Sequence, residues 1–512
     1  MPKIERLLLC SCDDSMSIDG TSASHALGGV PVRTARALCE TDLDIASEAL
    51  KSDGTTLIAC GQMTALFEEL AQDLGVEERL LTVDIRDRAG WTDAPNAHAK
   101  QAALLAEALT PRPDTPVRDI VSEGTCLILG DADDVLSAAR RLSETLAVTC
   151  LLSDAPDELS PDGRFDIATG NLKRASGSLG RFEIKVDAFR ELRPIGRGAG
   201  SFGGAQSDVT STCDIILDLR GASALFPADH KRDGYLRADP RDPVAVEKAI
   251  SDARDLQGVF EKPIYIRFEE TLCAHSRASR TGCNRCLNVC PTGAITPSGD
   301  TVSIDPDICA GCGACAAVCP SGAASYDDPP VTTLFTRLRA LATTYREAGG
   351  TAPRALFHES DWGGEMIALS ARFGQGLPPD VIPVEVASVE GVGHAEVLAA
   401  LGVGFAAVHL MPGPRSDRSV IEEQLALARA MASEKTVCML DVDDPDALER
   451  ALRTQSAEGA NHDPILPLGG RRDVTRLAAT ALNGNKAVLP LPKGAPYGAI
   501  EIDTEACTLC LA

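Results

Sequence analysis

The sequence predicts a multidomain α/β protein in which Rossmann-like parallel-sheet units flank a short, cysteine-rich domain. The chain has 512 residues, which is enough for several domains. Short aliphatic runs alternate with segments of helical periodicity over most of its length, as α/β folds require. Between residues 270 and 325 this periodicity disappears and eight cysteines take its place. Metal ligation, and not apolar burial, is therefore expected to organise that stretch.

Composition and charge exclude several classes of protein. The formal net charge is −25, so a general nucleic-acid binder, which needs a basic surface, is not expected. The longest uncharged apolar stretch, around 403–411, is about half the length of a membrane helix, so no integral membrane segment is expected. The apolar run that starts at Leu7 is short and is followed by Asp13 and Asp14, unlike a signal peptide. A cytoplasmic, reduced protein is the expectation.

Two α/β domains are expected before the cysteine-rich region, at 1–112 and 113–262, the second resembling a degenerate dinucleotide-binding domain. Aliphatic runs predict strands at 7–10, 56–60, 81–85, 126–129, 148–152 and 214–219. Apolar periodicity predicts helices at 63–74, 97–109 and 135–146. A proline-rich stretch at 110–116 marks the linker between the two domains, because proline cannot continue a helix.

A third α/β domain is expected at 350–453, beyond the cysteine-rich domain at 263–330. Its predicted strands lie at 355–358, 381–386, 405–410 and 436–440. Helical segments separate these strands, as a parallel sheet requires. The last part, 454–512, is rich in Gly, Pro and Asn and is expected to be loosely ordered until Ala499.

The strongest motif has the spacing C-x2-C-x2-C-x3-C-P, which is typical of [4Fe-4S] ligation in bacterial ferredoxins. Its cysteines are Cys309, Cys312, Cys315 and Cys319. The fourth cysteine of such a run ligates the other cluster of a pair. A partner motif lies upstream at Cys273, Cys283, Cys286 and Cys290. Zinc also binds C-x2-C pairs, but a zinc site takes four ligands in two pairs and not a doubled triplet.

The two motifs form an internal repeat, because Cys290-Pro-Thr-Gly-Ala matches Cys319-Pro-Ser-Gly-Ala. The spacing assigns one cubane to Cys273, Cys283, Cys286 and Cys319, and the other to Cys290, Cys309, Cys312 and Cys315. Nine residues separate Cys273 from Cys283 where two are usual, so residues 274–282 must loop out. If Cys273 does not reach, the cubane has an open iron or becomes a three-iron cluster, and His275 is the alternative ligand.

Basic residues mark the looped-out segment and its surroundings. Arg277 and Arg280 lie in it, with Arg285 nearby, either as a docking site for an acidic partner or as a solvated loop.

At the other end of the chain, the sequence before Cys507 and Cys510 repeats the sequence before Cys309 and Cys312. This third ferredoxin motif includes only the first two of its cysteines. Either the natural chain continues, or two thiols remain that cannot complete a cluster by themselves.

The cysteine-rich region resembles bacterial two-cluster ferredoxins, and the first 110 residues are similar to the amino-terminal domain of the HdrA subunit of heterodisulfide reductase. The second similarity rests on the Leu-Leu-Cys10-Ser-Cys12 strand end, Cys39, and the Leu-Ile-Ala-Cys60-Gly strand end. It implies a third [4Fe-4S] cluster on Cys10, Cys12, Cys39 and Cys60. The alternative is that these are buried strand-end thiols and incidental cysteines. In that family a flavin domain follows next.

A flavin site is not expected in this chain. The strand-turn-helix at 126–134 lacks the glycine fingerprint and has three aspartates that would repel a pyrophosphate. A G-x-G-x-x-G match at Gly198–Gly203 follows no strand, so it reads as a flexible loop.

The third α/β domain is similar in layout to the delta subunit of methyl-viologen-reducing hydrogenase, through residues 358–362 and 383–391. Where that family has cluster cysteines this chain has His358, Asp361 and Ala387, and Cys438 is the domain's only cysteine. His358, Asp361 and His394 at strand ends either bind a small ligand or are satisfied polar caps.

These observations favour an electron-transfer protein that relays electrons through two [4Fe-4S] clusters as a subunit or partner of a larger oxidoreductase. The expected partner is a redox protein, such as a flavin- or metal-dependent oxidoreductase. One alternative is a flavin-dependent oxidoreductase with an active site at 126–218. Another is an iron–sulfur protein whose clusters stabilise the fold or sense oxidation. No catalytic residues are assigned, because no hydrolytic triad, HExxH or Walker motif is present.

Overall fold

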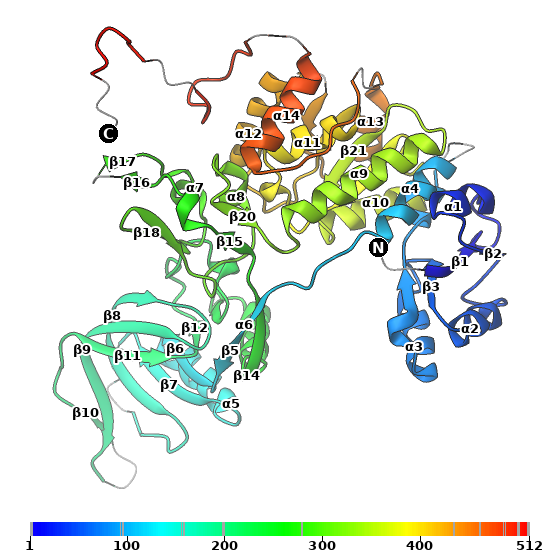
Figure 1. Cartoon of the computed structure of the whole chain (residues 1–512). Coiled ribbons are helices and arrows are strands. Elements are labelled where there is room, and N and C mark those ends of the chain that lie inside the picture. Colours follow the sequence, from blue (N-terminus) through cyan, green and yellow to red (C-terminus); the bar gives the residue numbers. More distant parts are fainter. Residues whose placement is uncertain are drawn as a thin grey trace. The chain divides into compact units, whose positions relative to one another are not determined.

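The computed structural model describes residues 4–92, 94, 97–154, 156, 159–196, 200–277, 280–433, 436–459, 462–484, 486, 488–498 and 502–508. The chain divides into two compact units (Figure 1). Unit 1 comprises residues 1–114, 267–273 and 312–512, and unit 2 comprises residues 115–266 and 274–311. The predicted mixed α/β architecture with parallel sheets is confirmed. The Rossmann-like arrangement of those sheets stays a prediction.

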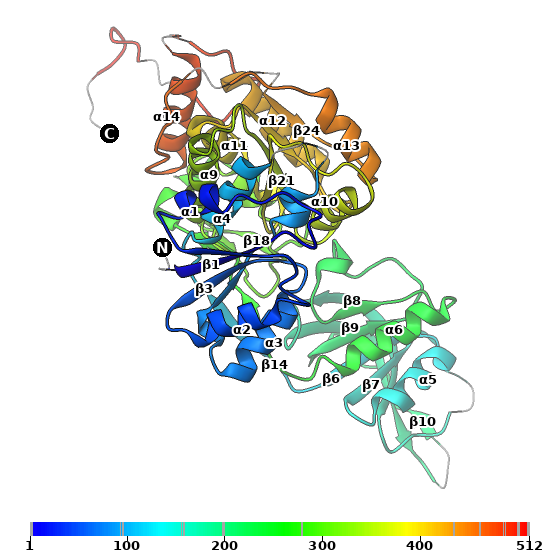
Figure 2. The same cartoon turned by 90° about the vertical axis from the view of Figure 1, so that its right-hand side faces the viewer.

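The first sheet of unit 1 has four parallel strands in the order β2-β1-β3-β4. Its strands are β1 (Ile4–Cys10), β2 (Val32–Ala35), β3 (Thr55–Ala59) and β4 (Leu80–Thr82). Both faces are covered by helices, as in a parallel sheet generally. Figure 2 shows α2 (Leu43–Lys51) and α3 (Thr64–Leu74) on one face and α1 (Gly20–Ala26) and α4 (His98–Ala108) on the other.

The second sheet of unit 1 repeats this strand order as β22-β21-β23-β24, again all parallel. Its strands are β21 (Arg354–His358), β22 (Val381–Glu385), β23 (Ala407–Leu410) and β24 (Val437–Met439). The helices around it are α10 (Trp362–Phe373), α11 (His394–Val403), α12 (Arg418–Met431) and α13 (Pro445–Thr454). Strands and helices therefore lie where the sequence predicts them.

One hydrophobic core joins the two sheets of unit 1. The long helix α9 (Val331–Glu347), which was not predicted from apolar periodicity, packs against α4, and its Leu338 and Leu341 are fully buried. The same core includes Leu7 of β1 and Phe357 of β21. Several polar contacts cross this junction, among them those made by Arg337 and Lys100. The Arg337 guanidinium pairs with buried Glu107 at 2.6 Å, and Lys100 Nζ donates to the carbonyls of Leu377 and Pro378 at 3.2 and 2.9 Å.

Unit 2 contains a sheet that is parallel at one side and antiparallel at the other. The parallel strands are β6 (Thr125–Gly130), β7 (Ala147–Leu152), β8 (Asp166–Ser176), β12 (Ile215–Asp218) and β13 (Tyr235–Arg237). Helices α5 (Ala132–Leu142) and α6 (Pro243–Arg254) cover one face. On the other face Phe226 packs against Phe182 of β9 (Phe182–Pro194) and Tyr235 of β13, and β9 pairs antiparallel with β8.

Three expectations about local structure need correction. The tail is not loosely ordered up to Ala499, because α14 (Arg471–Asn483) buries Val474 and Ala478 against α11. Residues of the G-x-G-x-x-G match are not a loop throughout. Gly200–Phe202 form β10, which pairs with β9, while residues 197–199 lie outside the described part of the chain. His394 is the first residue of α11 and not a strand end.

The cysteine-rich region contributes short elements to each unit. In unit 2 these are α7 (Arg285–Val289) and the hairpins β16–β17 (Ser276–Arg277, Arg280–Thr281) and β18–β19 (Ile295–Ser298, Thr301–Ile304). In unit 1 they are α8 (Ala314–Val318) and the paired strands β15 (Ile266–Phe268) and β20 (Ala324–Tyr326). The first residue of β15, Ile266, is the last residue of the 115–266 segment of unit 2. Such brief elements bury little apolar surface, which fits a region organised by metal.

Candidate metal centre

The two Cys-Pro turns of the repeat have the same local structure. Cys290 follows α7 with φ −73° and ψ 108°, and Cys319 follows α8 with φ −73° and ψ 110°. A hydroxyl two residues later lies near each sulfur. The Cys290 Sγ to Thr292 Oγ1 distance is 3.7 Å, and the Cys319 Sγ to Ser321 Oγ distance is 3.6 Å. The sequence repeat is thus also a structural repeat.

Glycines in and beside the motifs allow the backbone to approach closely. Gly293 and Gly322, the third residues after each repeat cysteine, have φ of +70° and +77°, where a side chain would be strained. Gly313, between two cysteines of the second motif, also has a positive φ. A Cβ there would lie 2.7 Å from the Cα of Gly391. The small residues of the motif are therefore required by the backbone itself.

Backbone N–H groups point at the cysteine sulfurs of the second motif. Ala324 N lies 3.5 Å from Cys319 Sγ, and the Gly311 amide donates to the Cys309 thiol. Burial is the main cause that raises the pKa of Cys309, and the neighbouring Cys290 raises it further. A bound cation would offset this cost, because metal stabilises the thiolate form. Donors around partly buried thiols fit an iron–sulfur cluster, whose potential depends on N–H···S contacts and exposure.

The long spacing after Cys273 is explained by a hairpin. The amides of Gly282 and Cys283 donate to the carbonyl of His275 at 2.7 and 3.2 Å, so the chain returns to its starting point. The expected looping-out of this segment is confirmed. His275 Nδ1 is hydrogen-bonded to the Cys283 carbonyl at 2.8 Å. This bond gives His275 a structural role in closing the hairpin.

The third motif near the end of the chain repeats the turn that precedes Cys309. The Cys309 amide donates to the Asp305 carbonyl at 3.0 Å, and the Cys507 amide donates to the Asp503 carbonyl at 2.9 Å. In both turns the aspartate Oδ1 also accepts the amide two residues on, at 3.0 Å. Cys507 is exposed, and Cys510 lies outside the described residues.

The four N-terminal cysteines gather at the carboxyl-terminal edge of the first sheet. Cys10 ends β1, and its sulfur accepts the amides of Cys12 and Leu38 at 3.3 and 3.5 Å. Burial is the main cause that raises the pKa values of Cys39 and Cys60. The neighbouring thiols raise them further, Cys10 and Cys12 acting on Cys39, and Cys39 and Cys10 on Cys60. Strands β1 and β3 thus bring together thiols that are far apart in sequence.

The loop after Cys10 has a backbone that L-residues rarely adopt. Cys12, Asp13 and Asp14 have φ of +53°, +57° and +62° in succession. Strain of this kind is concentrated at functional sites, where the surrounding structure enforces it. The Arg86 guanidinium lies 3.5 Å from the Cys12 sulfur, so a positive charge faces the thiol. These features single out the loop as a candidate site.

At the corresponding edge of the second sheet several polar side chains have partners, whereas the buried Nε2 atoms of His358 and His409 have none among the described residues. His394 is hydrogen-bonded to Gln424 at 2.7 Å and to the Tyr497 hydroxyl at 2.6 Å. Cys438 lies 2.8 Å from His409 Nδ1. His358 Nδ1 contacts the Glu359 carbonyl at 2.9 Å, and burial lowers the pKa of His358 to about 4. Of the described side chains, no three or more from His, Cys, Asp and Glu are arranged to hold a metal ion.

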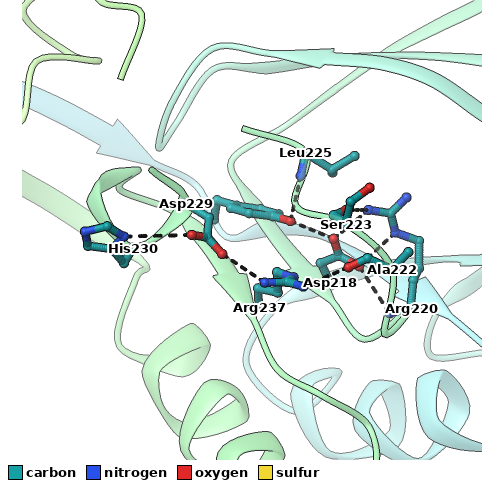
Figure 3. A network of polar contacts seen from close by, with 9 residues as sticks. Asp218, Arg220, Ala222, Ser223, Leu225, Asp229, His230 and Arg237 are labelled. Atoms are coloured by element: carbon teal, nitrogen blue, oxygen red, sulfur yellow. Dashed lines mark hydrogen bonds and ion pairs between the residues drawn. The ribbon is translucent and has the colours of Figure 1, made fainter. Parts of the chain in front are cut away.

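A buried ion pair occupies the carboxyl-terminal end of β12 in unit 2 (Figure 3). The Asp218 carboxylate accepts Arg220 Nη2 at 2.7 Å and the Tyr235 hydroxyl at 2.6 Å. At the end of the neighbouring β6, a Cβ on Gly130 would lie 2.9 Å from the Leu219 carbonyl. In open α/β sheets a ligand crevice forms at this type of position. In this sheet the Asp218, Arg220 and Tyr235 side chains and the close approach of Gly130 to Leu219 occupy the position that a ligand would take.

Sequence reasoning missed two arginines that contact the Cys319 turn. Arg471 Nη2 donates to the Ala317 carbonyl at 2.8 Å, and Arg472 Nε donates to the Pro320 carbonyl at 3.1 Å. Both arginines lie in the first turn of α14, where positive charge opposes the helix dipole. Two positive charges at a helix N-terminus are unfavourable, so other groups must stabilise these arginines. This feature can be recognised in the sequence once α14 is identified.

Comparison with known families assigns part of this region. Residues 279–323 match the family model of the 4Fe-4S dicluster domain. This range contains seven of the eight predicted ligands and begins after Cys273. The comparison with curated proteins finds no match. No helix in the described part of the chain has the length and apolar character needed to cross a membrane.

Proposed function

We propose that this chain relays electrons through two [4Fe-4S] clusters as a subunit or partner of a larger oxidoreductase. The 4Fe-4S dicluster domain at 279–323 is the observation that carries this proposal. A dicluster domain implies iron–sulfur clusters, and iron–sulfur clusters transfer single electrons. The matching Cys-Pro turns at Cys290 and Cys319 support a duplicated ligand set.

The proposed ligands follow the spacing of two-cluster ferredoxins. One cluster takes Cys273, Cys283, Cys286 and Cys319, and the other takes Cys290, Cys309, Cys312 and Cys315. Cys273 lies before the matched range, so it is the ligand that most needs a test. The hairpin closed at His275 supports its inclusion, because it removes the extra residues from the path to Cys283.

We further propose a third cluster on Cys10, Cys12, Cys39 and Cys60. Three observations support it: the nearby thiols that raise the pKa values of Cys39 and Cys60, the strained loop at Cys12–Asp14 and the Arg86 charge beside Cys12. A cubane holds one thiolate at each of its four irons, so its ligands are spread more widely than those of a single ion.

The first experiment measures iron and acid-labile sulfide per chain on anaerobically purified protein, with EPR after dithionite reduction. We expect at least about eight irons and spectra of interacting cubanes. Cys315→Ser should remove one cubane signal, and Cys273→Ser should convert the other to a three-iron signal. Exposed Cys507→Ser is the matched control and should change neither. Zinc without sulfide in the wild-type chain would overturn the proposal.

A further inference from the structure

Arg86 begins a rare backbone element beside the N-terminal cysteines. Residues Arg86–Gly90 form a π-helical turn, in which the Trp91 amide donates to the Arg86 carbonyl at 2.8 Å. The π-helix is uncommon in proteins and often marks a functional site. Because its hydrogen bonds span five residues, Arg86 and Trp91 lie on the same side of the turn. The guanidinium carbon is 3.9 Å from the centre of the Trp91 ring, which is a cation–π contact.

Two further contacts fix the direction of the Arg86 side chain. Its Nε donates to Asp87 Oδ1 at 2.9 Å, and the Asp87 side chain is only 3% exposed. The other oxygen of this carboxylate accepts Arg372 Nη2 at 2.8 Å, so that one carboxylate serves two arginines. Asp84 Oδ1 accepts the amides of Arg86 and Asp87 at 2.8 and 3.0 Å, which holds the backbone of the turn.

The free end of the guanidinium faces Cys12. Arg86 Nη1 donates to the Cys12 sulfur at 3.5 Å. Trp91 is attached to the same loop, because its Nε1 donates to Ser15 Oγ at 2.9 Å and Ser15 Oγ donates to the Cys12 carbonyl at 2.6 Å. The cysteine, the guanidinium and the indole therefore form a closed set of contacts that keeps Arg86 on the sulfur.

The two aspartates that follow Cys12 have a cation of their own. Asp13 and Asp14 pair with Arg36 at 2.7 and 3.0 Å. The Arg86 side chain is 17% exposed, so its contact with Cys12 is partly shielded from water. Shielding of this kind strengthens the effect of a charge on its neighbour.

We propose that Arg86 raises the reduction potential of the third cluster by donating a hydrogen bond to the sulfur of its ligand Cys12. This inference rests on the proposed third cluster. Reduction adds one electron to [4Fe-4S]²⁺ and gives [4Fe-4S]⁺, so the cluster and its thiolates become more negative by one charge. A cationic donor at a ligand sulfur stabilises the reduced state more than the oxidised state. Arg86 acts through Cys12 and does not bind iron itself.

Redox titration of the full, anaerobically purified chain, followed by EPR, tests this role. The signal of the third cluster is the component that is missing in Cys10→Ser/Cys60→Ser. Arg86→Gln removes the charge and should lower the midpoint potential of this component. We expect the equilibrium constant for reduction to fall about tenfold, which is about 59 mV for a one-electron couple. Arg86→Lys retains the charge without the planar fork and should lower the potential by less.

Arg33→Gln is the matched control. Arg33 lies in β2 of the same sheet and pairs with Glu48 at 2.9 Å, so its loss changes the net charge equally at a site remote from the Cys12 contact. Its potential should equal that of the wild type. An unchanged potential in Arg86→Gln at wild-type iron content, or an equal shift in Arg33→Gln, would overturn the inference.

Iron content separates the other outcomes. If Arg86→Gln loses the cluster, Arg86→Lys decides, and an unchanged potential there overturns the inference. Loss of the cluster from both variants also overturns it, because Arg86 would then be needed for assembly. A wild-type chain with about eight irons contradicts the third cluster itself, whereas one with about twelve irons whose potential does not respond to Arg86→Gln contradicts this inference alone.

Discussion

The two parallel sheets of unit 1 have the same strand order and share one hydrophobic core, but they present different groups at their carboxyl-terminal edges. The first sheet presents thiols around Cys10, with a strained loop and an arginine beside them. At the second, Glu359 Oε1 accepts the Val389 amide at 3.1 Å and the Ser388 hydroxyl at 3.4 Å. A parallel sheet brings the loops at this edge together in both cases. The residue types in the loops therefore decide whether the edge presents mainly thiols or mainly carboxylate and histidine side chains.

The largest expected difference between the two edges is in iron content. The double variant Cys10→Ser/Cys60→Ser should lower the iron content from about twelve to about eight per chain, because it removes two ligands of the proposed third cluster. The matched control at the other edge, Cys438→Ser, should leave iron unchanged, since Cys438 is hydrogen-bonded to His409. Iron and sulfide analysis provides the measurement. Equal iron in the wild type and the double variant would remove the difference between the edges.

The junction between the sheets should make the stability of unit 1 depend on pH. Lys100 is fully buried, and burial lowers its pKa from 10.5 to about 7. Between these values the unfolded chain binds the proton more strongly, so the free energy of unfolding should rise with pH from about 7 to 10.5, by a few kcal/mol at most.

Apparent Tm values across this pH range test the Lys100 prediction. Lys100→Met should lose most of the increase, whereas Lys51→Met, at an exposed position of α2, should retain it. A Lys100→Met profile that rises like the wild type would show that other groups cause the dependence.

The smallest expected effect compares the backbone of the two edge loops. Asp13→Val should destabilise the fold by about 1–2 kcal/mol, because φ is +57° and a β-branched residue is strained there. Asp361→Val, at φ −64° in the corresponding loop of the second sheet, should cost less. Chemical denaturation of both variants measures the difference. Equal losses would mean that the Cys12–Asp14 loop is not the more strained one.

Prediction from sequence worked best where a local pattern determined the structure. Seven of the eight strands in the two unit 1 sheets and the Cys-Pro repeat follow from apolar periodicity and from motif spacing, whereas β2 was not predicted. Helices α1, α2 and α9 were not predicted, and α14 lies in a segment that was expected to be loosely ordered. Arg337 and Lys100 show why long-range burial is hard to foresee: both are charged residues whose place in the core depends on partners far along the chain.

The sequence by itself determined which residues can bind iron, because ligand type and spacing are local properties, and it determined most of the parallel strands of unit 1. Only the tertiary structure decided which distant groups meet. It brought the four N-terminal thiols to one sheet edge and placed Arg471 and Arg472 against the Cys319 turn. These contacts arise because burying the faces of sheets and helices fixes their neighbours, and no short stretch of sequence contains that information.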